Sequence, residues 1–468
     1  MGDEPGLTVD RRELSPRVLR LGVGAVVLLN LILLLGVQHY WHGDLPFQDE
    51  WGYVARLQKL PQLGLAHFLF DRSETYYVPV LMFVWYQAYT WTHLDIEAIR
   101  YLGACVSASV ATWFCVLLYR RAPNHDRLRW ALLLYAPFLV CSLNHYATYY
   151  QSIESVNKPF LFGMVLTAFW AAERSLQGRR AWLWTGLAAA ALLGVGTYAP
   201  GLAILPAIAG TQILIQRRLS LSAVLLALLG VLCIGFYVHA GHGLSHPEQR
   251  PGFSFGDLWQ ACKMWPGLTG NSLFSPHAGE LEVIAYLLGA GLIAAQATGL
   301  YLALRQDPGR RARLFLPVAL TLYNNLVFLE ILTTRLHTVE GGLESSFIPR
   351  YSILMLAGPA SVMFYLMMLD DLKGRLKRLA SAALMAMAAG TLAAELLIMV
   401  ALPHFAKVLA TARADLLSLQ GEPNSFQQTQ MLLTPAMKPL VYPDKLFLQQ
   451  EHLALYRQAA SQPFPPAP

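Results

Sequence analysis

Apolar runs of about twenty residues, separated by short polar segments, form the main pattern of this chain. An α-helix of that length spans the hydrocarbon core of a bilayer and satisfies its own backbone hydrogen bonds there. The runs lie at residues 18–37, 97–119, 130–144, 158–173, 181–198, 200–216, 219–239, 281–304, 314–332, 351–369 and 380–402. The pattern therefore predicts an all-α, polytopic membrane protein with about eleven transmembrane helices.

Arginine and lysine cluster in every second segment between these runs. The basic segments are 11–20, 120–129, 174–180, 217–218, 305–313 and 373–378, and they hold more than half of the 35 basic residues. Short basic loops remain in the cytoplasm, so the N-terminus is predicted to be cytoplasmic. The segments predicted to face the periplasm are then 38–96, 145–157, 240–280, 333–350 and a tail at 403–468. Residues 1–402 form the predicted transmembrane domain.

The first outer loop, 38–96, carries helical patterns of its own. Trp51, Val54, Leu57 and Leu60 recur every three residues, which predicts an amphipathic interfacial helix that ends at Pro61. Residues 78–93 are apolar but only about sixteen long, which is short for a crossing. A crossing there would also place the basic segment 120–129 outside. We therefore expect 78–93 to lie at, or dip into, the outer face.

Composition agrees with this membrane assignment and excludes two other classes. The chain is 55% hydrophobic and 14% charged, which does not fit a single soluble core. Its formal net charge of +6 does not indicate nucleic-acid binding, because the basic residues form short clusters between apolar runs and no continuous stripe. We expect a multi-pass protein of the inner (plasma) membrane.

Asp49 and Glu50 form an acidic pair a few residues after the first apolar run. Ionisable groups held against a bilayer are costly, and they often mark function. Asp49 also fits a plain structural role as the N-cap of a helix that begins at Glu50. Both interpretations stay open from these residues alone.

Further polar residues gather close to the runs in the other outer segments. Each has an ordinary interpretation as a loop charge, a snorkelling lysine or an arginine that anchors a helix end. Together they supply carboxylates and cations at one face of the membrane, which is what a general base and a phosphate site need. These residues are Glu74, Glu154, Lys158, Arg335, His337, Arg350 and Tyr351.

Several short segments resemble motifs of the GT-C glycosyltransferases. Residues 48–55 (QDEWGYVA) resemble the first-loop P-D-E-x-x-Y-A motif of this superfamily, nearest the branch of the lipid A aminoarabinose transferase and the protein O-mannosyltransferases. Residues 73–81 (SETYYVPVL) are similar to the element that opens a short apolar helix in that branch, and 96–100 (IEAIR) to the start of its next span. The turn at 197–201 and the residues from Arg335 to Tyr351 resemble turns of related bacterial enzymes.

The resemblance implies a GT-C-like fold and a sugar donor linked to polyprenyl phosphate. The acceptor would be a hydroxyl of a periplasmic or cell-surface glycan, lipid or protein, for example in lipopolysaccharide. Asp49 is then the candidate base, and Glu50 and Glu74 orient acceptor or sugar. Arg335 and Arg350, with Lys158 as a third cation, are candidates for the lipid phosphate. The other candidates for substrate contact are Tyr53, Glu154, His337 and Tyr351.

Two rival functions share the lipid-linked substrate. A transporter or flippase is expected to bury paired charges in mid-span, whereas a polymerase or ligase would extend the glycan. The long outer loop directly after the first span favours the glycosyltransferase. No metal-ligand spacing appears, so the sequence requires no metal; it leaves the dependence on a divalent cation open.

Overall fold

The computed structural model describes residues 16–40, 46, 50–70, 78–121, 127–178, 181–240, 255–275, 281–335, 349–368, 375–418, 447–451 and 453–454. The elements along these ranges are α1 (Pro16–Tyr40), α2 (Glu50–Phe70), α3 (Pro79–Thr92), α4 (Ile96–Tyr119), α5 (Arg127–Cys141), η1 (Leu143–His145), α6 (Tyr146–Tyr150), α7 (Ser152–Gly178), α8 (Ala181–Thr197), η2 (Ala199–Ala203), α9 (Ile204–Gln216), α10 (Leu221–Ala240), α11 (Phe255–Asn271), α12 (Glu282–Arg305), α13 (Pro308–Arg313), α14 (Phe315–Arg335), η6 (Pro349–Leu356), α15 (Ala357–Met368) and α16 (Arg375–Ser418). All are α- or 3-10 helices, which confirms the all-α prediction for the described residues.

Each apolar run coincides with a helix or with two consecutive helices. Seven helical stretches among the described residues are long and apolar enough to cross a membrane: 20–40, 96–119, 199–216, 282–305, 315–332, 351–368 and 381–407. Residues 184–197 and 221–237 form shorter apolar helices. The chain is thus a multi-pass membrane protein, while a count of eleven crossings stays a prediction.

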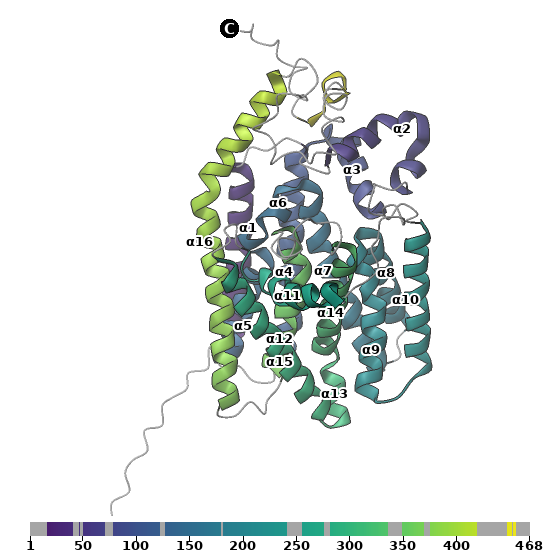
Figure 1. Ribbon diagram of the computed structural model, residues 1–468, viewed down its shortest axis with the longest axis vertical. Coiled ribbons are helices and arrows are strands. Elements are labelled where there is room, and N and C mark those ends of the chain that lie inside the picture. The colour runs from purple at the N-terminus through teal and green to yellow at the C-terminus, as the bar shows by residue number, and fades with distance from the viewer. Residues whose placement is uncertain are drawn as a thin grey trace, which may run out of the picture.

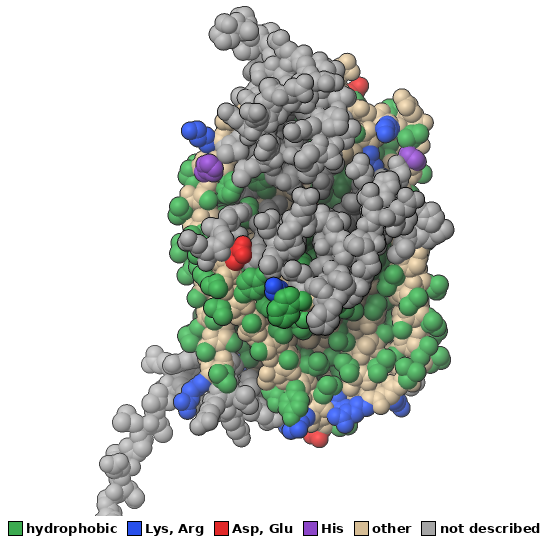
Figure 2. All heavy atoms as spheres, viewed as in Figure 1, with side chains coloured by type: hydrophobic (Ala, Val, Ile, Leu, Met, Phe, Trp, Pro, Cys, Tyr) green, Lys and Arg blue, Asp and Glu red, His purple; other side chains and the backbone are tan. Residues whose placement is uncertain are grey.

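Contacts between distant segments define one end of the helix bundle, which we call the basic end. The Arg20 guanidinium on α1 donates to the Tyr119 hydroxyl on α4 at 3.5 Å, and Arg121 pairs with Glu173 near the end of α7. Arg217, after α9, donates to the backbone carbonyl of Leu304 on α12. Lysine and arginine side chains gather along the lower edge of Figure 2, where Figure 1 places α13 and the α9–α10 turn.

Helices α2 and α3 lie at the opposite end, which we call the α2 end (Figure 1). Part of the C-terminal tail lies there too, because the Ala454 N–H donates to the His93 carbonyl just after α3 at 3.0 Å. Leu448 and Leu453 are buried there. The tail segment 447–454 therefore shares an end with α3. Which side of the membrane that end faces stays a prediction.

The helix predicted from residue 51 onwards is confirmed, whereas its interfacial position stays a prediction and its end is not at Pro61. Trp51, Val54 and Leu57 are buried as the periodicity predicts, and α2 continues through Pro61 to Phe70. The break comes at Gly64, whose φ of 81° and ψ of 166° lie in a region that is strained for residues with a Cβ. A proline bends a helix and removes one hydrogen bond without stopping it when tertiary contacts hold both sides.

Two further helices of the predicted outer segments, α3 and α11, are short. α3 has 14 residues, and at 1.5 Å per residue this is about 21 Å, less than the ~30 Å of a hydrocarbon core. α11 lies in segment 240–280, for which the sequence pattern made no helix prediction, and contacts α12, α14 and η6. In Figure 1, α11 runs across the bundle, whereas α16 follows its length.

The orientation of the bundle is testable by cysteine labelling in whole cells. In a variant without the five native cysteines, we expect a membrane-impermeant thiol reagent to label a cysteine at Ser425 but not one at Asn124. The reason is the arginine content around Asn124, which retains that loop in the cytoplasm. Both positions lie outside the described residues. The reverse labelling pattern would overturn the predicted orientation.

Candidate functional site

Buried polar side chains gather at the α2 end of the bundle, around η1, α6 and the start of α7. We call this group the polar cluster. Its members are Glu50, Arg100, Asn144, His145, Glu154, Asn157, Lys158 and Ser352, and none is more than 7% exposed. Removing such groups from water is unfavourable unless they are paired, so their contacts show what each one does.

Glu50 connects α2 to α7. It is 1% exposed, and its Oε1 accepts a hydrogen bond from the Ser152 hydroxyl at 2.7 Å and one from the Ile153 N–H at 3.1 Å. These donors lie at the N-terminus of α7, where backbone N–H groups lack helical partners and the helix dipole favours a negative charge. The carboxylate thus caps α7 from another helix and holds the start of α2 against it.

Truncating this carboxylate should loosen the contact between α2 and α7. We expect Glu50→Ala to lower the free energy of unfolding by about 1–3 kcal/mol, because two buried donors lose their acceptor. Glu50→Gln should be milder, since an amide oxygen still accepts. Thermal unfolding of the purified protein measures this, with the exposed Gln62→Ala on α2 as the matched control. Equal stability of Glu50→Ala and the control would contradict this role.

Glu154 and Lys158 form a buried ion pair one helical turn apart on α7. The Lys158 Nζ lies 2.5 Å from Glu154 Oε2, and both side chains are buried. The same Nζ lies 6.0 Å from the centre of the Tyr198 ring, which follows α8. A buried ammonium group is stabilised by a carboxylate and an aromatic face together. The pair therefore places a cation and an anion side by side within the polar cluster.

Arg100 brings a second cation to the cluster from α4. Its guanidinium carbon lies 5.8 Å from the centre of the Tyr150 ring on α6, and the side chain is 4% exposed. One turn later, Gly103 allows α4 and α7 to approach closely. A Cβ at Gly103 would lie 2.7 Å from the carbonyl carbon of Ser155. Any larger residue would push Arg100 and the ion pair of α7 apart.

The short helix η1 supplies Asn144 and His145, and both side chains are held on two sides. The Asn144 amide donates to the Asn271 carbonyl at the end of α11 and accepts from the Ser275 N–H at 2.6 Å. His145 Nε2 bonds to the Leu139 carbonyl at 3.0 Å, so this nitrogen carries the proton, and Nδ1 accepts from the Ser352 hydroxyl at 2.7 Å.

His145 is neutral in this position. Burial lowers the pKa of its imidazole to about 4. The histidine is therefore uncharged near pH 7 and offers no cation to a phosphate. With both ring nitrogens already bonded, it links η1 to η6 and so fixes the position of Tyr351, the neighbour of Ser352, which is itself buried.

A carboxylate from the last long helix also holds η1. Glu395 on α16 is buried, and its Oε1 accepts from the Leu143 N–H at 2.8 Å. Neighbouring contacts support the same packing, since the Tyr135 hydroxyl bonds to Thr391 at 2.7 Å. The N-terminus of η1 thus depends on a residue more than two hundred positions further along the chain.

Asn157 carries a buried polar atom whose hydrogen bonding is incomplete. The residue is 3% exposed, and its Oδ1 has no hydrogen-bond partner among the described residues. A buried carbonyl oxygen left without a donor costs about 1–3 kcal/mol. Asn157 directly precedes Lys158, so this acceptor lies on the same turn of α7 as the buried ion pair. It is suited to receive a hydrogen bond from a hydroxyl group of a ligand.

The structure brings together some of the residues predicted for the site and leaves others undescribed. Asp49, Glu74 and His337 lie outside the described residues. Arg335 ends α14 and Arg350 lies in η6, two elements that contact each other, but only the backbone of these residues is described. Tyr53 is buried, with its ring centre 5.7 Å from that of Trp85 on α3, so it packs α2 on α3.

A basic hollow on α2 was not part of the predicted site. Arg56, Lys59 and His67 line it together with Leu60, Leu63, Gly64 and Phe68. The bend at Gly64 brings His67 near the two cations of the preceding turns. Figure 2 shows basic and histidine side chains at its upper right, where Figure 1 places α2. In the sequence, Arg56 and Lys59 lie between the apolar positions Val54, Leu57 and Leu60 of this helix.

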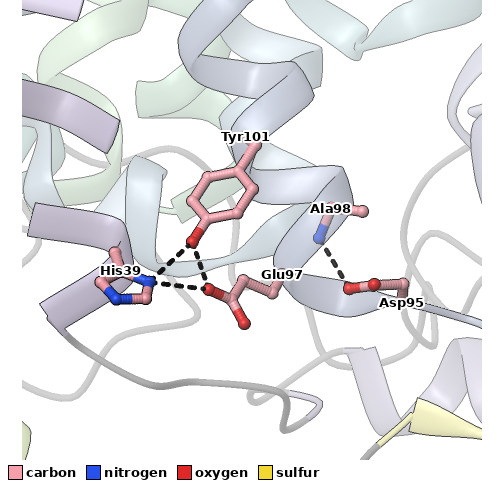
Figure 3. Close-up of polar contacts among 5 residues, drawn as sticks. All are labelled: His39, Asp95, Glu97, Ala98 and Tyr101. Atoms are coloured by element: carbon pink, nitrogen blue, oxygen red, sulfur yellow. Dashed lines mark hydrogen bonds and ion pairs between the residues drawn. The ribbon is translucent and has the colours of Figure 1, made fainter. Parts of the chain in front are cut away.

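A separate polar group joins α1 to α4 at the same end (Figure 3). The Tyr101 hydroxyl donates to Glu97, and His39 Nδ1 lies 3.2 Å from that hydroxyl and 3.6 Å from Glu97 Oε1. Beside it, Asp95 caps α4 by accepting from the Ala98 N–H at 2.8 Å. The His39 side chain is 72% exposed, so its ion pair adds little stability.

Comparison with protein-family models and with curated proteins found no match to this chain. Within the described residues, no group of three or more histidine, cysteine, aspartate or glutamate side chains is placed to hold a metal ion. The arrangement at the α2 end is therefore interpreted from its own chemistry, which among the described residues includes the cap on α7, the buried ion pair and the unsatisfied Asn157 Oδ1.

Proposed function

We propose that this protein is a membrane glycosyltransferase of the GT-C type, with about eleven transmembrane helices in the inner membrane. It transfers a sugar from a polyprenyl-phosphate donor to a hydroxyl of a periplasmic or cell-surface acceptor. The N-terminus is cytoplasmic and the α2 end faces the periplasm in this proposal. The acceptor class is a glycan, lipid or protein of the cell envelope.

The observation that carries the proposal is the contact of Glu50 with the start of α7. It fixes where the chain enters α2, next to the turn of α7 that bears Glu154 and Lys158. Asp49 directly precedes Glu50, and consecutive Cα atoms are about 3.8 Å apart. The proposal therefore puts the candidate base beside a buried cation and the open acceptor of Asn157.

The reaction assigned to this site needs a base and cations but no strong acid. The oxygen of the acceptor hydroxyl attacks the anomeric carbon of the sugar, and Asp49 takes the proton of that hydroxyl as a general base. The bond from that carbon to the phosphate oxygen breaks, and polyprenyl phosphate leaves with the electron pair. Lys158, with Arg335 and Arg350 from the α14–η6 region, meets the charge of the leaving phosphate.

Reconstitution with a defined donor tests the proposal. The purified protein is placed in vesicles with a synthetic polyprenyl-phosphate sugar and extracts of envelope acceptors, and products are identified by mass. A glycosyltransferase releases polyprenyl phosphate and adds one sugar to the acceptor. Movement of intact donor between leaflets would instead identify a flippase, and a longer lipid-linked glycan a polymerase. In cells, deletion of the gene should lower the mass of one surface glycan, lipid or pilin by one sugar.

A further inference from the structure

A hollow of about 430 Å³ lies at the basic end, between the last turn of α9 and the last turn of α12. Its lining combines two arginines with four aliphatic side chains: Arg217, Arg218, Ile213, Leu214, Leu219 and Leu304. No acidic side chain is among them. This combination suits a ligand that is anionic at one end and apolar at the other.

The backbone holds Arg217 at the rim of this hollow. Arg217 caps α9 in the left-handed conformation, with φ 51° and ψ 30°, and its guanidinium donates to the Leu304 carbonyl at 2.7 Å. A guanidinium has five N–H donors in a planar fork, so most of this group stays available to an anion. The strained backbone and the single anchoring bond together orient the fork.

The nearby helix ends do not compete strongly for these cations. The last carbonyls of α9 and α12 carry partial negative charge, but Arg311 donates to the carbonyls of Ile215 and Gln306, and Arg217 to that of Leu304. Arg218 is exposed and makes no such bond within the described residues. At least one full guanidinium therefore remains for an external anion.

The position of the hollow distinguishes a lipid from a soluble anion. It lies at the turn between an apolar stretch long enough to cross a membrane, 199–216, and the shorter apolar helix 221–237. Ile213 and Leu219 there are 37% and 72% exposed. A soluble phosphate gains nothing from these side chains, whereas an acyl chain buries them. The basic end is expected to face the cytoplasmic leaflet, which is rich in anionic lipids.

We propose that this hollow binds the phosphate headgroup of an anionic phospholipid from that leaflet, with one acyl chain against Ile213, Leu214 and Leu304. The site is independent of the glycosyltransferase proposal, because it lies at the opposite end of the bundle. It anchors the α9–α10 turn to the membrane surface through Arg217 and Arg218.

Native mass spectrometry and thermal unfolding in detergent micelles test this proposal, with dioleoylphosphatidylglycerol as the probe and dioleoylphosphatidylcholine as the neutral reference. The test variant is Arg217→Gln/Arg218→Gln. The matched control is Arg310→Gln/Arg313→Gln, which removes two exposed charges on α13 at the same end. The test variant should bind phosphatidylglycerol at least about tenfold more weakly than the control, from roughly fivefold per arginine.

A second variant, Ile213→Trp, fills the apolar floor and keeps both charges, and it should also weaken binding. It decides the question if the double arginine variant does not fold. An equal loss of phosphatidylglycerol affinity in the test and control variants would show that the lipid responds only to the general surface charge of the basic end, and would overturn the proposal. Displacement of the lipid by glycerol phosphate at equal concentration would show that a soluble anion binds there. Equal binding of the two lipids by the unmodified protein would also overturn the proposal.

Discussion

Asp49→Asn is expected to lower the rate of sugar transfer by roughly 10²–10⁴-fold while expression and folding stay normal. An asparagine amide has nearly the shape of the carboxylate but does not accept the proton of the acceptor hydroxyl. If Asp49 only caps α2, asparagine caps about as well and transfer survives. Transfer to the acceptor from a purified polyprenyl-phosphate sugar measures the difference.

Asp95 offers a matched control for this substitution. Its carboxylate accepts from the Ala98 N–H at the start of α4, which is the plain capping role proposed as the alternative for Asp49. Asp95→Asn should therefore retain both stability and transfer. Near-normal activity of Asp49→Asn alongside Asp95→Asn would remove Asp49 from the chemistry. The same result would leave Glu74 as the next carboxylate to test.

Lys158→Met is expected to lower the free energy of unfolding by about 3–5 kcal/mol, because it leaves the Glu154 carboxylate buried without its partner. The double variant Glu154→Gln/Lys158→Met removes both charges and should recover most of that loss. Denaturant unfolding of the single and double variants in micelles forms a double-mutant cycle for the pair. A double variant as unstable as the single one would contradict the ion pair.

Activity of the same double variant separates structure from function. If Lys158 meets the leaving phosphate, the double variant is folded but transfers sugar slowly, and this is the result we expect. Return of transfer together with stability would make the pair purely structural. The phosphate would then depend on Arg335 and Arg350 alone.

The helices of the bundle were predictable because their lipid-facing and core-facing positions are both apolar. Each such helix therefore appears as a continuous apolar run in the sequence. α11 was missed for a physical reason. Asp257 and Lys263 interrupt it, and Pro266 lies inside it, so no apolar run is visible. Its buried residues Ala261, Met264 and Leu268 are spaced three and four apart, the only signal it gave.

The partners within the site were not predictable from a single chain. His145 and Ser352 are 207 positions apart, and Leu143 and Glu395 are 252 apart, yet each pair is within hydrogen-bond distance. Such contacts follow from the packing order of the helices. The sequence did indicate that Glu50 and Glu154 lie near one membrane face. The capping of α7 by Glu50 could not be predicted, because it depends on how α2 packs against α7.

The bond between Glu395 and η1 has a consequence for how the protein is made. Because 252 residues separate the two partners, the Leu143 N–H waits for its acceptor while the ribosome adds the rest of the chain. At about 5–20 residues per second, this interval lasts on the order of tens of seconds. During it, η1 lacks this acceptor, and a chaperone or insertase has time to act on the unfinished bundle. Nascent chains released before α16 should therefore be recognised and degraded by membrane quality control.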